Sequence, residues 1–262
     1  MAARGHESAG TLGIRLFDEG LNGLNARLAH IENDVAIIKE YLVTKMRADT
    51  SQRDNIGGIA MTGSRAGALR AIYHEPNERA ALKVLDHLDI HCRNFIALSP
   101  FLVLSTTSAQ GRVDASPRGD PPGFVAVPDE RTLLLPDRPG NNQIDSLRNL
   151  VEQPRVGLLF FVPGMNETLR VKGTAEIVTA PTLLASLSVG GKVPAAALRV
   201  TVEEAFLHCG RALIRSRLWD PAIQIERSVF PTYGQVLADQ IAGADAEEID
   251  AAEEEANRTQ LY

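Results

Sequence analysis

Residues that could bind an anion are concentrated between positions 116 and 148 of the 262-residue chain. Ser116 and Arg118 are two residues apart at the end of a strand-like segment, and side chains at that spacing point to the same face of a strand. Asn142 and Ser146 are four residues apart in a segment with helical periodicity, which predicts that they share one face of a short helix. The candidates are Ser116, Arg118, Arg138, Asn141, Asn142, Ser146 and Arg148.

A phosphate group is the ligand that suits this combination of hydroxyl, amide and guanidinium donors. Asn141 or Asn142 stands where the expected helix begins, and a helix N-terminus offers free N–H groups and the positive end of its dipole. A phosphate there would receive backbone, hydroxyl and guanidinium donors together. The alternative is that these are turn residues, a helix cap and surface arginines. The spacing alone leaves both interpretations open.

The elements that must position these residues are strands with short helices between them. Apolar or alternating segments predict strands over residues 101–108, 112–119, 123–127, 131–136, 156–162, 168–178 and 195–202. Helical patterns cover residues 141–153, 181–189, 203–209 and 211–218. Antiparallel strands with inserted helices predict an α+β fold built on a small barrel rather than a doubly wound sheet. No GxGxxG follows a strand and no GxSxG is present, which argues against a Rossmann nucleotide site and an α/β hydrolase.

Two short helices are expected before the barrel. One begins after Asn77, which can cap it, and the second runs from about Ile90 to Leu98 and ends before Pro100. His87, His91 and Cys92 lie close together here, and the two histidines are four residues apart. Because only three ligands cluster and no CxxC is nearby, we favour a packed helix face over a metal site.

The chain divides into three parts: an N-terminal extension over residues 1–70, a barrel domain over 71–235 and an acidic tail over 236–262. Apolar residues at alternating spacings of three and four predict a long helix over about 21–46. Its narrow stripe could pack on a second copy of itself or on its own subunit. A linker is expected over 48–70, and the acidic, alanine-rich end is expected to be solvated and poorly ordered.

Bulk composition excludes several functional classes. A net charge of −6, from 27 basic and 33 acidic residues, argues against a generic nucleic-acid or anionic-membrane surface. No apolar segment approaches the roughly 20 residues that span a bilayer. The only two cysteines, Cys92 and Cys209, lie in apolar surroundings, which favours free buried thiols in a reducing cytoplasm. Composition therefore predicts neither a nucleic-acid nor a membrane partner.

Several phrases of the sequence resemble those of a known family. They are FLVLSTTSAQGRVDASPRGDPPGFV, RTLLLPDRPGNNQIDSLRNLVEQPRVGLLFFVPG, ETLRVKGTAEIV and HCGRALIRSRLWDP. From about Glu75 to Pro221 the chain resembles the flavin-binding split-barrel superfamily, the pyridoxamine 5′-phosphate oxidase-like proteins. It most resembles their branch of FMN-dependent enzymes whose substrate is unknown. The resemblance implies a six-stranded split barrel that forms a homodimer, with FMN in a groove between the subunits.

The resemblance also implies which residues contact the flavin. Ser116 and Arg118 correspond to the first phosphate-contacting strand, and Asp137 and Arg138 to the end of the second. Asn141, Asn142 and Ser146 correspond to the start of the helix that follows. On the ring side, Arg170 lies on the strand that reaches the ring edge. Arg217 and Trp219 match a C-terminal pair that often contacts flavin from the second subunit.

This chain departs from the family pattern in two places. The family's Ser-Arg-Lys at the helix start is replaced by Asn-Asn-Gln-Ile-Asp-Ser, which puts the individual phosphate contacts in question. The Arg-Leu-His signature that grips pyridoxal phosphate is replaced by Arg-Ser-Arg-Leu-Trp, so oxidation of vitamin B6 is not expected.

The expected function is therefore that of an FMN-dependent oxidoreductase acting on a small molecule. Arg170 or Arg217 would stabilise the reduced flavin, and no residue stands out as a general acid or base. One alternative is a split barrel that binds haem, with His208 as the candidate ligand, or a deazaflavin. Another is a non-catalytic flavin-binding or interaction module, in which the N-terminal helix drives higher assembly.

Overall fold

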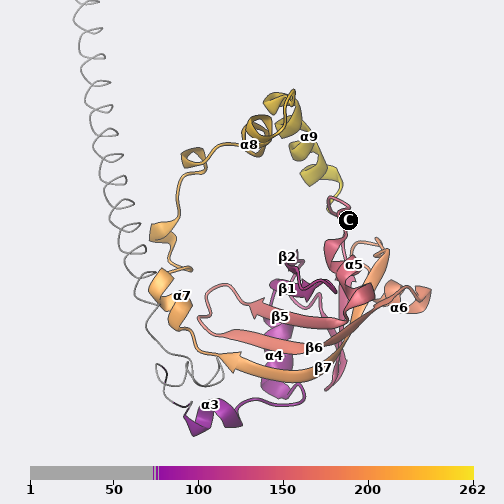
Figure 1. Cartoon of the computed structure of the whole chain (residues 1–262), viewed down its shortest axis with the longest axis vertical. Coiled ribbons are helices and arrows are strands. Elements are labelled where there is room, and N and C mark those ends of the chain that lie inside the picture. Colours follow the sequence, from indigo (N-terminus) through magenta and orange to yellow (C-terminus); the bar gives the residue numbers. More distant parts are fainter. Residues whose placement is uncertain (1–72, 74, 76) are drawn as a thin grey trace, which may run out of the picture. The chain divides into compact units, whose positions relative to one another are not determined.

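The computed structural model describes residues 73, 75 and 77–262 (Figure 1). The helix expected over residues 21–46 and the linker expected over 48–70 lie outside the described residues. The helices are α3 (Glu78–Leu82), α4 (Ile90–Leu98), α5 (Asp145–Glu152), α6 (Pro181–Ser186), α7 (Arg211–Ser216), α8 (Tyr233–Gln240) and α9 (Ala246–Thr259), with 3₁₀ turns η2 (Pro221–Ile223) and η3 (Arg227–Val229). The strands are β1 (Phe101–Thr107), β2 (Val113–Gly119), β3 (Ala126–Asp129), β4 (Thr132–Asp137), β5 (Arg155–Phe161), β6 (Thr168–Val178) and β7 (Ala196–His208).

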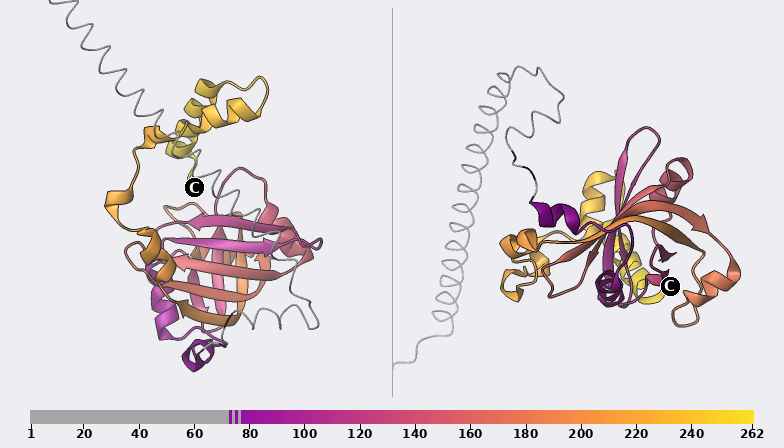
Figure 2. Two further views of the ribbon diagram at one scale, coloured as in Figure 1. Left: turned by 60° about the vertical axis from the view of Figure 1, so that its left-hand side comes forward. Right: turned by 90° about the horizontal axis from the view of Figure 1, so that it is seen from below.

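The strands form one antiparallel sheet in the order β2-β1-β5-β6-β7-β4-β3. With helices inserted between them, this confirms the mainly antiparallel α+β class, and it is consistent with a split barrel. Within the described residues the sheet has seven strands, matching the seven strand-like segments of the sequence, so the six strands that the family resemblance implied are not confirmed. The strands curve around the core (Figure 2).

The alternation of buried and exposed residues in the central strands builds this core. In the pairing of β1 with β5, Leu102 faces Phe160 and Leu104 faces Leu158, and all four side chains are buried. Helix α4 packs against β6 and β7 and adds Phe95 to the same cluster. The period of two in these strands therefore places one face inside and leaves the other for contacts outside the barrel.

Strand β7 corrects one sequence expectation, because residues 203–209 were expected to be helical and nearly all of them continue the strand. Glu203 forms an ion pair with Arg155 at 2.6 Å, and Glu204 forms one with Lys172 at 2.6 Å. These partners lie on β5 and β6, far away in sequence. Pairing with β6 therefore outweighs the local helical preference of this segment.

The long pairing of β6 with β7 requires a glycine at position 173. The register shifts between Lys172 and Gly173, and a Cβ atom on Gly173 would lie 1.9 Å from the carbonyl oxygen of Thr201. Any side chain here must push the two strands apart.

We expect Gly173→Ala to lower the free energy of unfolding by about 3 kcal/mol or more, because the backbone of Thr201 cannot yield cheaply. Gly157→Ala in β5 is the matched control, since its Cβ would meet only the Cβ of Ser105 at 3.9 Å. Denaturant unfolding of both variants measures the difference. Equal stability of the two would show that β6 and β7 do not approach this closely.

The helices before the sheet begin where the sequence predicts. The Asn77 side chain accepts a hydrogen bond from the N–H of Ala80, and the Asp89 carboxylate accepts one from the N–H of Cys92. Helix α4 ends at Leu98, two residues before Pro100, as expected. Helix α3 is short because the chain beyond it runs as a strand-like bridge to β7.

The two cysteines differ in their surroundings. Cys92 is buried, and burial raises the pKa of its thiol to about 12. Cys209 is exposed, so the expectation that both thiols are buried is wrong for this residue. Within the described part of the chain, no group of three or more His, Cys, Asp or Glu side chains is arranged to hold a metal ion.

The C-terminal end is helical rather than irregular, which corrects a further expectation. Thr232 caps α8 and Asp245 caps α9, and the N–H of Gly234 donates to the Asp250 carboxylate at 2.7 Å. The chain leaves the sheet at α7 and passes through α8 and α9 (Figure 1), and Tyr262 contacts Asp120, which follows β2. Among the described helices, none has the length and apolarity needed to cross a bilayer.

Candidate functional site

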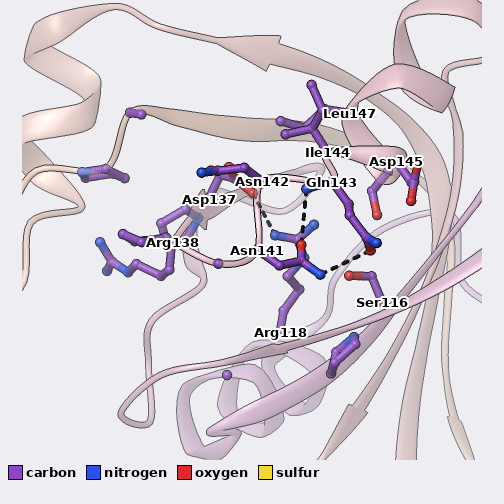
Figure 3. A pocket seen from close by; sticks show the side chains of 18 of the residues that line it. Ser116, Arg118, Asp137, Arg138, Asn141, Asn142, Gln143, Ile144, Asp145 and Leu147 are labelled. Carbon is purple, nitrogen blue, oxygen red and sulfur yellow. Dashed lines mark hydrogen bonds and ion pairs between the residues drawn. The ribbon is translucent and has the colours of Figure 1, made fainter. Parts of the chain in front are cut away.

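A cavity of about 820 Å³ lies where the ends of β2 and β4 meet the start of α5 (Figure 3). The loop before β7 and the C-terminal residue complete its walls. Its volume is in the range of sites that bind small molecules and cofactors. Seven residues that the sequence predicts as contacts line it: Ser116, Arg118, Asp137, Arg138, Asn141, Asn142 and Ser146.

The entrance to α5 is a strained loop rather than a regular helix start. The helix begins at Asp145, and Asn142 and Ile144 before it adopt positive φ values of 57° and 50°. Asn142 and Ser146 therefore do not share a helix face, and neither Asn141 nor Asn142 stands at the helix start as expected. A β-branched residue with positive φ is rare, and such strain persists mainly where the surroundings impose it.

No side chain in the described residues caps α5. The N–H groups of its first turn are therefore available to a ligand. Asn141 instead stabilises the loop, because its side-chain oxygen accepts a hydrogen bond from the N–H of Gln143 at 3.1 Å. Residues 145–147 of this first turn line the cavity, and the helix dipole favours negative charge there.

One nitrogen of the Arg118 guanidinium joins two strand ends at the cavity, and another has no partner among the described residues. Its Nη1 donates to the Asp137 carboxylate at 2.6 Å, which joins β2 to the end of β4. Its Nε is buried and has no hydrogen-bond partner within the described residues. A buried donor without a partner costs free energy, so this atom is a strong candidate for contact with a bound acceptor.

A second ion pair joins the same two strand ends with the charges exchanged, because Arg138 follows β4 and Asp120 follows β2. Arg138 Nε lies 2.6 Å from Asp120 Oδ2, and the two side chains are 14% and 1% exposed. Arg138 also donates to the carbonyl of Leu187 at 3.0 Å, which fixes the C-terminal end of α6. The hydroxyl of Tyr262 donates to the other oxygen of Asp120 at 2.5 Å.

Ser146 lines the cavity but already uses its proton. Its hydroxyl donates to Asp114 Oδ2 at 2.7 Å, and the side chain is 3% exposed. A hydroxyl has one proton to donate, so Ser146 cannot also donate to an anion while this bond is intact. Its role is to attach α5 to β2. Asn149 does the same toward β1 by donating to Thr106 at 3.0 Å.

Lys192 is a site residue that the sequence analysis missed. It follows the Gly190-Gly191 turn, whose φ values are 54° and 80°, and it exchanges two backbone hydrogen bonds with Val189. Two glycines with positive φ favour a tight hairpin turn, so Lys192 is held in place at the edge of the cavity. No carboxylate partner of Lys192 is found among the described residues. The Gly-Gly pair was the only local signal for it.

Residues 88–209 match the family model of pyridoxamine 5′-phosphate oxidase. This part of the chain belongs to the pyridoxamine 5′-phosphate oxidase-like family. Comparison with the curated proteins finds no match.

Solved structures with a similar chain course include three bacterial proteins. HupZ of Group A Streptococcus is 19% identical, with 45% of this chain and 92% of that chain covered and a TM-score of 0.38. A pyridoxinephosphate oxidase family protein of Clostridium acetobutylicum is 16% identical, with 46% and 87% covered and a TM-score of 0.34. An FMN-binding protein of Syntrophomonas wolfei is 12% identical, with 44% and 80% covered and a TM-score of 0.35.

Four arginine and tryptophan candidates do not line the cavity of this pyridoxamine 5′-phosphate oxidase-like domain. Arg148 is exposed on α5, and Arg170 lies on β6 between Leu159 and Phe206. Arg217 pairs with Asp220, and the indole N–H of Trp219 donates to the carbonyl of Met165 at 2.7 Å. That Arg170, Arg217 and Trp219 contact a flavin from a second subunit stays a prediction.

His208, the candidate haem ligand, ends β7 and also lies outside this cavity. It faces Thr168 in the register with β6. Burial lowers the pKa of its imidazole, and the charges of Arg170 and Lys83 lower it further. The imidazole is therefore neutral near pH 7. The two nearby cations explain why this end of β7 disfavours a third positive charge.

We expect Ser146→Ala to lower the free energy of unfolding by about 1.5–3 kcal/mol, because it leaves a hydrogen bond to the Asp114 carboxylate unmade at a buried position. Denaturant unfolding measures this loss. Ser186→Ala is the control, since that hydroxyl donates only to a carbonyl within its own exposed helix. A Ser146→Ala protein as stable as this control would contradict the assigned role.

Proposed function

We propose that the pocket binds FMN and that the protein is an FMN-dependent oxidoreductase acting on a small molecule. Membership of residues 88–209 in the pyridoxamine 5′-phosphate oxidase-like family supports flavin chemistry at the level of the family. The observation that carries the proposal is the buried, unpartnered Nε of Arg118, a residue that lines the cavity together with Ser116 and Lys192. A phosphate supplies the acceptors that these donors need.

The charges of the pocket fit one phosphate if Lys192 takes part. Arg118 and Arg138 are each neutralised by an aspartate at 2.6 Å, so neither offers a full positive charge to a ligand. Lys192 lines the cavity without a carboxylate partner among the described residues. The proposed phosphate contacts are therefore Arg118 Nε, the Lys192 ammonium, the Ser116 hydroxyl and the first-turn N–H groups of α5.

When bound, FMN supplies the electron-transfer chemistry. The chain's own residues bind the cofactor and fix its position, and the cavity walls limit access of water. No general acid or base is proposed. His208 is neutral near pH 7 but lies outside the cavity, so it does not support the haem alternative there.

A homodimer is part of the proposal. The outer face of β1 and β5 presents apolar side chains that the barrel only half covers: Phe101, Val103, Leu159 and Phe161. The rings of Phe101 and Phe161 lie 6.1 Å apart, so they form one patch. Arg170 neighbours Leu159 in the pairing of β5 with β6. A second copy on this face would bring Arg170 into the interface, where the family resemblance expects flavin contacts.

We expect Lys192→Ala and Arg118→Ala each to weaken FMN binding by about tenfold or more, because a charge-assisted hydrogen bond contributes about 1.5–3 kcal/mol. In Lys192→Ala, riboflavin, which lacks the phosphate, should lose much less affinity. Titration of flavin fluorescence measures both ligands. Lys192→Arg should restore FMN binding, since it restores the charge.

Arg148→Ala is the matched control, because this exposed arginine lies on α5 outside the cavity. Equal losses for FMN and riboflavin in Lys192→Ala would contradict the phosphate assignment. Unchanged FMN affinity in both Lys192→Ala and Arg118→Ala would remove the pocket as the site.

A further inference from the structure

The last residue of the chain is part of the pocket wall. Tyr262 lines the cavity although the rest of the wall comes from residues 114–195. Its hydroxyl donates to Asp120 Oδ1 at 2.5 Å, and its ring lies 5.5 Å from the guanidinium carbon of Arg138. Two different contacts, a hydrogen bond and a cation–π interaction, therefore attach the chain end to one ion pair.

The partner of Tyr262 is built to receive it. Asp120 is almost completely buried and uses one oxygen for Arg138 and the other for Tyr262. A buried carboxylate needs hydrogen bonds to both oxygens, so loss of Tyr262 would leave Oδ1 without this donor. The hydrogen bond to Asp120 also raises the pKa of the Tyr262 phenol, which keeps the donor protonated.

The segment before Tyr262 is suited to carry it back to the sheet. Helix α9 has 14 residues, is capped by Asp245, and is held to α8 through the Gly234–Asp250 contact. A Cβ on Gly234 would lie 2.1 Å from the carbonyl oxygen of Ala246, so the two helices are closely packed. Leu261, next to the chain end, is 61% exposed and does not line the cavity.

We propose that Tyr262 is a binding residue of this pocket: the C-terminal tyrosine closes the side formed by Arg138 and Asp120, and it slows the release of the bound flavin. The inference rests on the proposed function and deepens it. A ligand in the cavity lies against the ring, and the ring must leave Arg138 before that side opens. Such contacts act mainly on the dissociation rate.

The test uses the full chain loaded with FMN, with release followed by the fluorescence of free flavin after dilution. Tyr262→Ala should release FMN about tenfold faster, because it removes both the hydrogen bond and the ring. Tyr262→Phe should lie between Tyr262→Ala and the unchanged protein, since it keeps the ring over Arg138 and loses only the bond to Asp120. Leu261→Ala is the matched control and should release FMN at the original rate.

Two results would overturn the inference while leaving the proposed function intact. One is an unchanged release rate in Tyr262→Ala, which would show that the chain end is not part of the wall. The other is slower release or tighter binding in Tyr262→Ala, which would show that the tyrosine competes with the ligand for the cavity. An unchanged chain that takes up no FMN would overturn the proposed function, and this inference with it.

Discussion

Two arginine–aspartate pairs that join the end of β2 to the end of β4 are the interaction on which the pocket depends. In the sheet order, β2 is one edge and β4 lies beside the other, so no backbone ladder connects them. Arg118 of β2 reaches Asp137 of β4, and Arg138 after β4 reaches Asp120 after β2. Each strand end contributes one arginine and one aspartate. The cavity lies between the two strand ends that these ion pairs connect.

The same pairs determine what the pocket can bind. Burial of a charge is costly unless it is paired, and removing one partner of a buried pair leaves the other uncompensated. Asp120 and Arg138 must therefore stay together, and their charges cancel. The groups that remain for a ligand are hydrogen-bond donors and one positive charge. They are the unpartnered Nε of Arg118, the first-turn N–H groups of α5 and the ammonium of Lys192. Donors in this arrangement favour a compact anion held by several hydrogen bonds.

Local patterns predicted the parts of the fold that local interactions determine. The alternation in β1 and the bounds of α4, set by Asp89 and Pro100, follow from near neighbours in sequence. The strand character of residues 203–208 could not be predicted this way, because their ion-pair partners lie on β5 and β6. The late start of α5 also contradicts local preference, since Ile144 rarely adopts positive φ.

The residues of the candidate site also fall into those that local patterns predict and those that depend on distant contacts. Ser116, Arg118 and Arg138 could be found from residue type and spacing, and the structure brings them to one cavity. The commitment of the Ser146 proton to Asp114 could not, because it depends on a contact 32 residues away. Tyr262 meets Asp120 across 142 residues, and composition alone indicated only a solvated tail. Long-range contacts thus decide which of the plausible donors remain free.

The most direct test of the central claim is the visible absorption spectrum of the purified full-length protein, recorded before and after addition of FMN and then of a reduced nicotinamide. We expect a protein-bound flavin spectrum that bleaches on reduction. A Soret band, or a protein that takes up no FMN, would contradict the assignment of this pocket to a flavin.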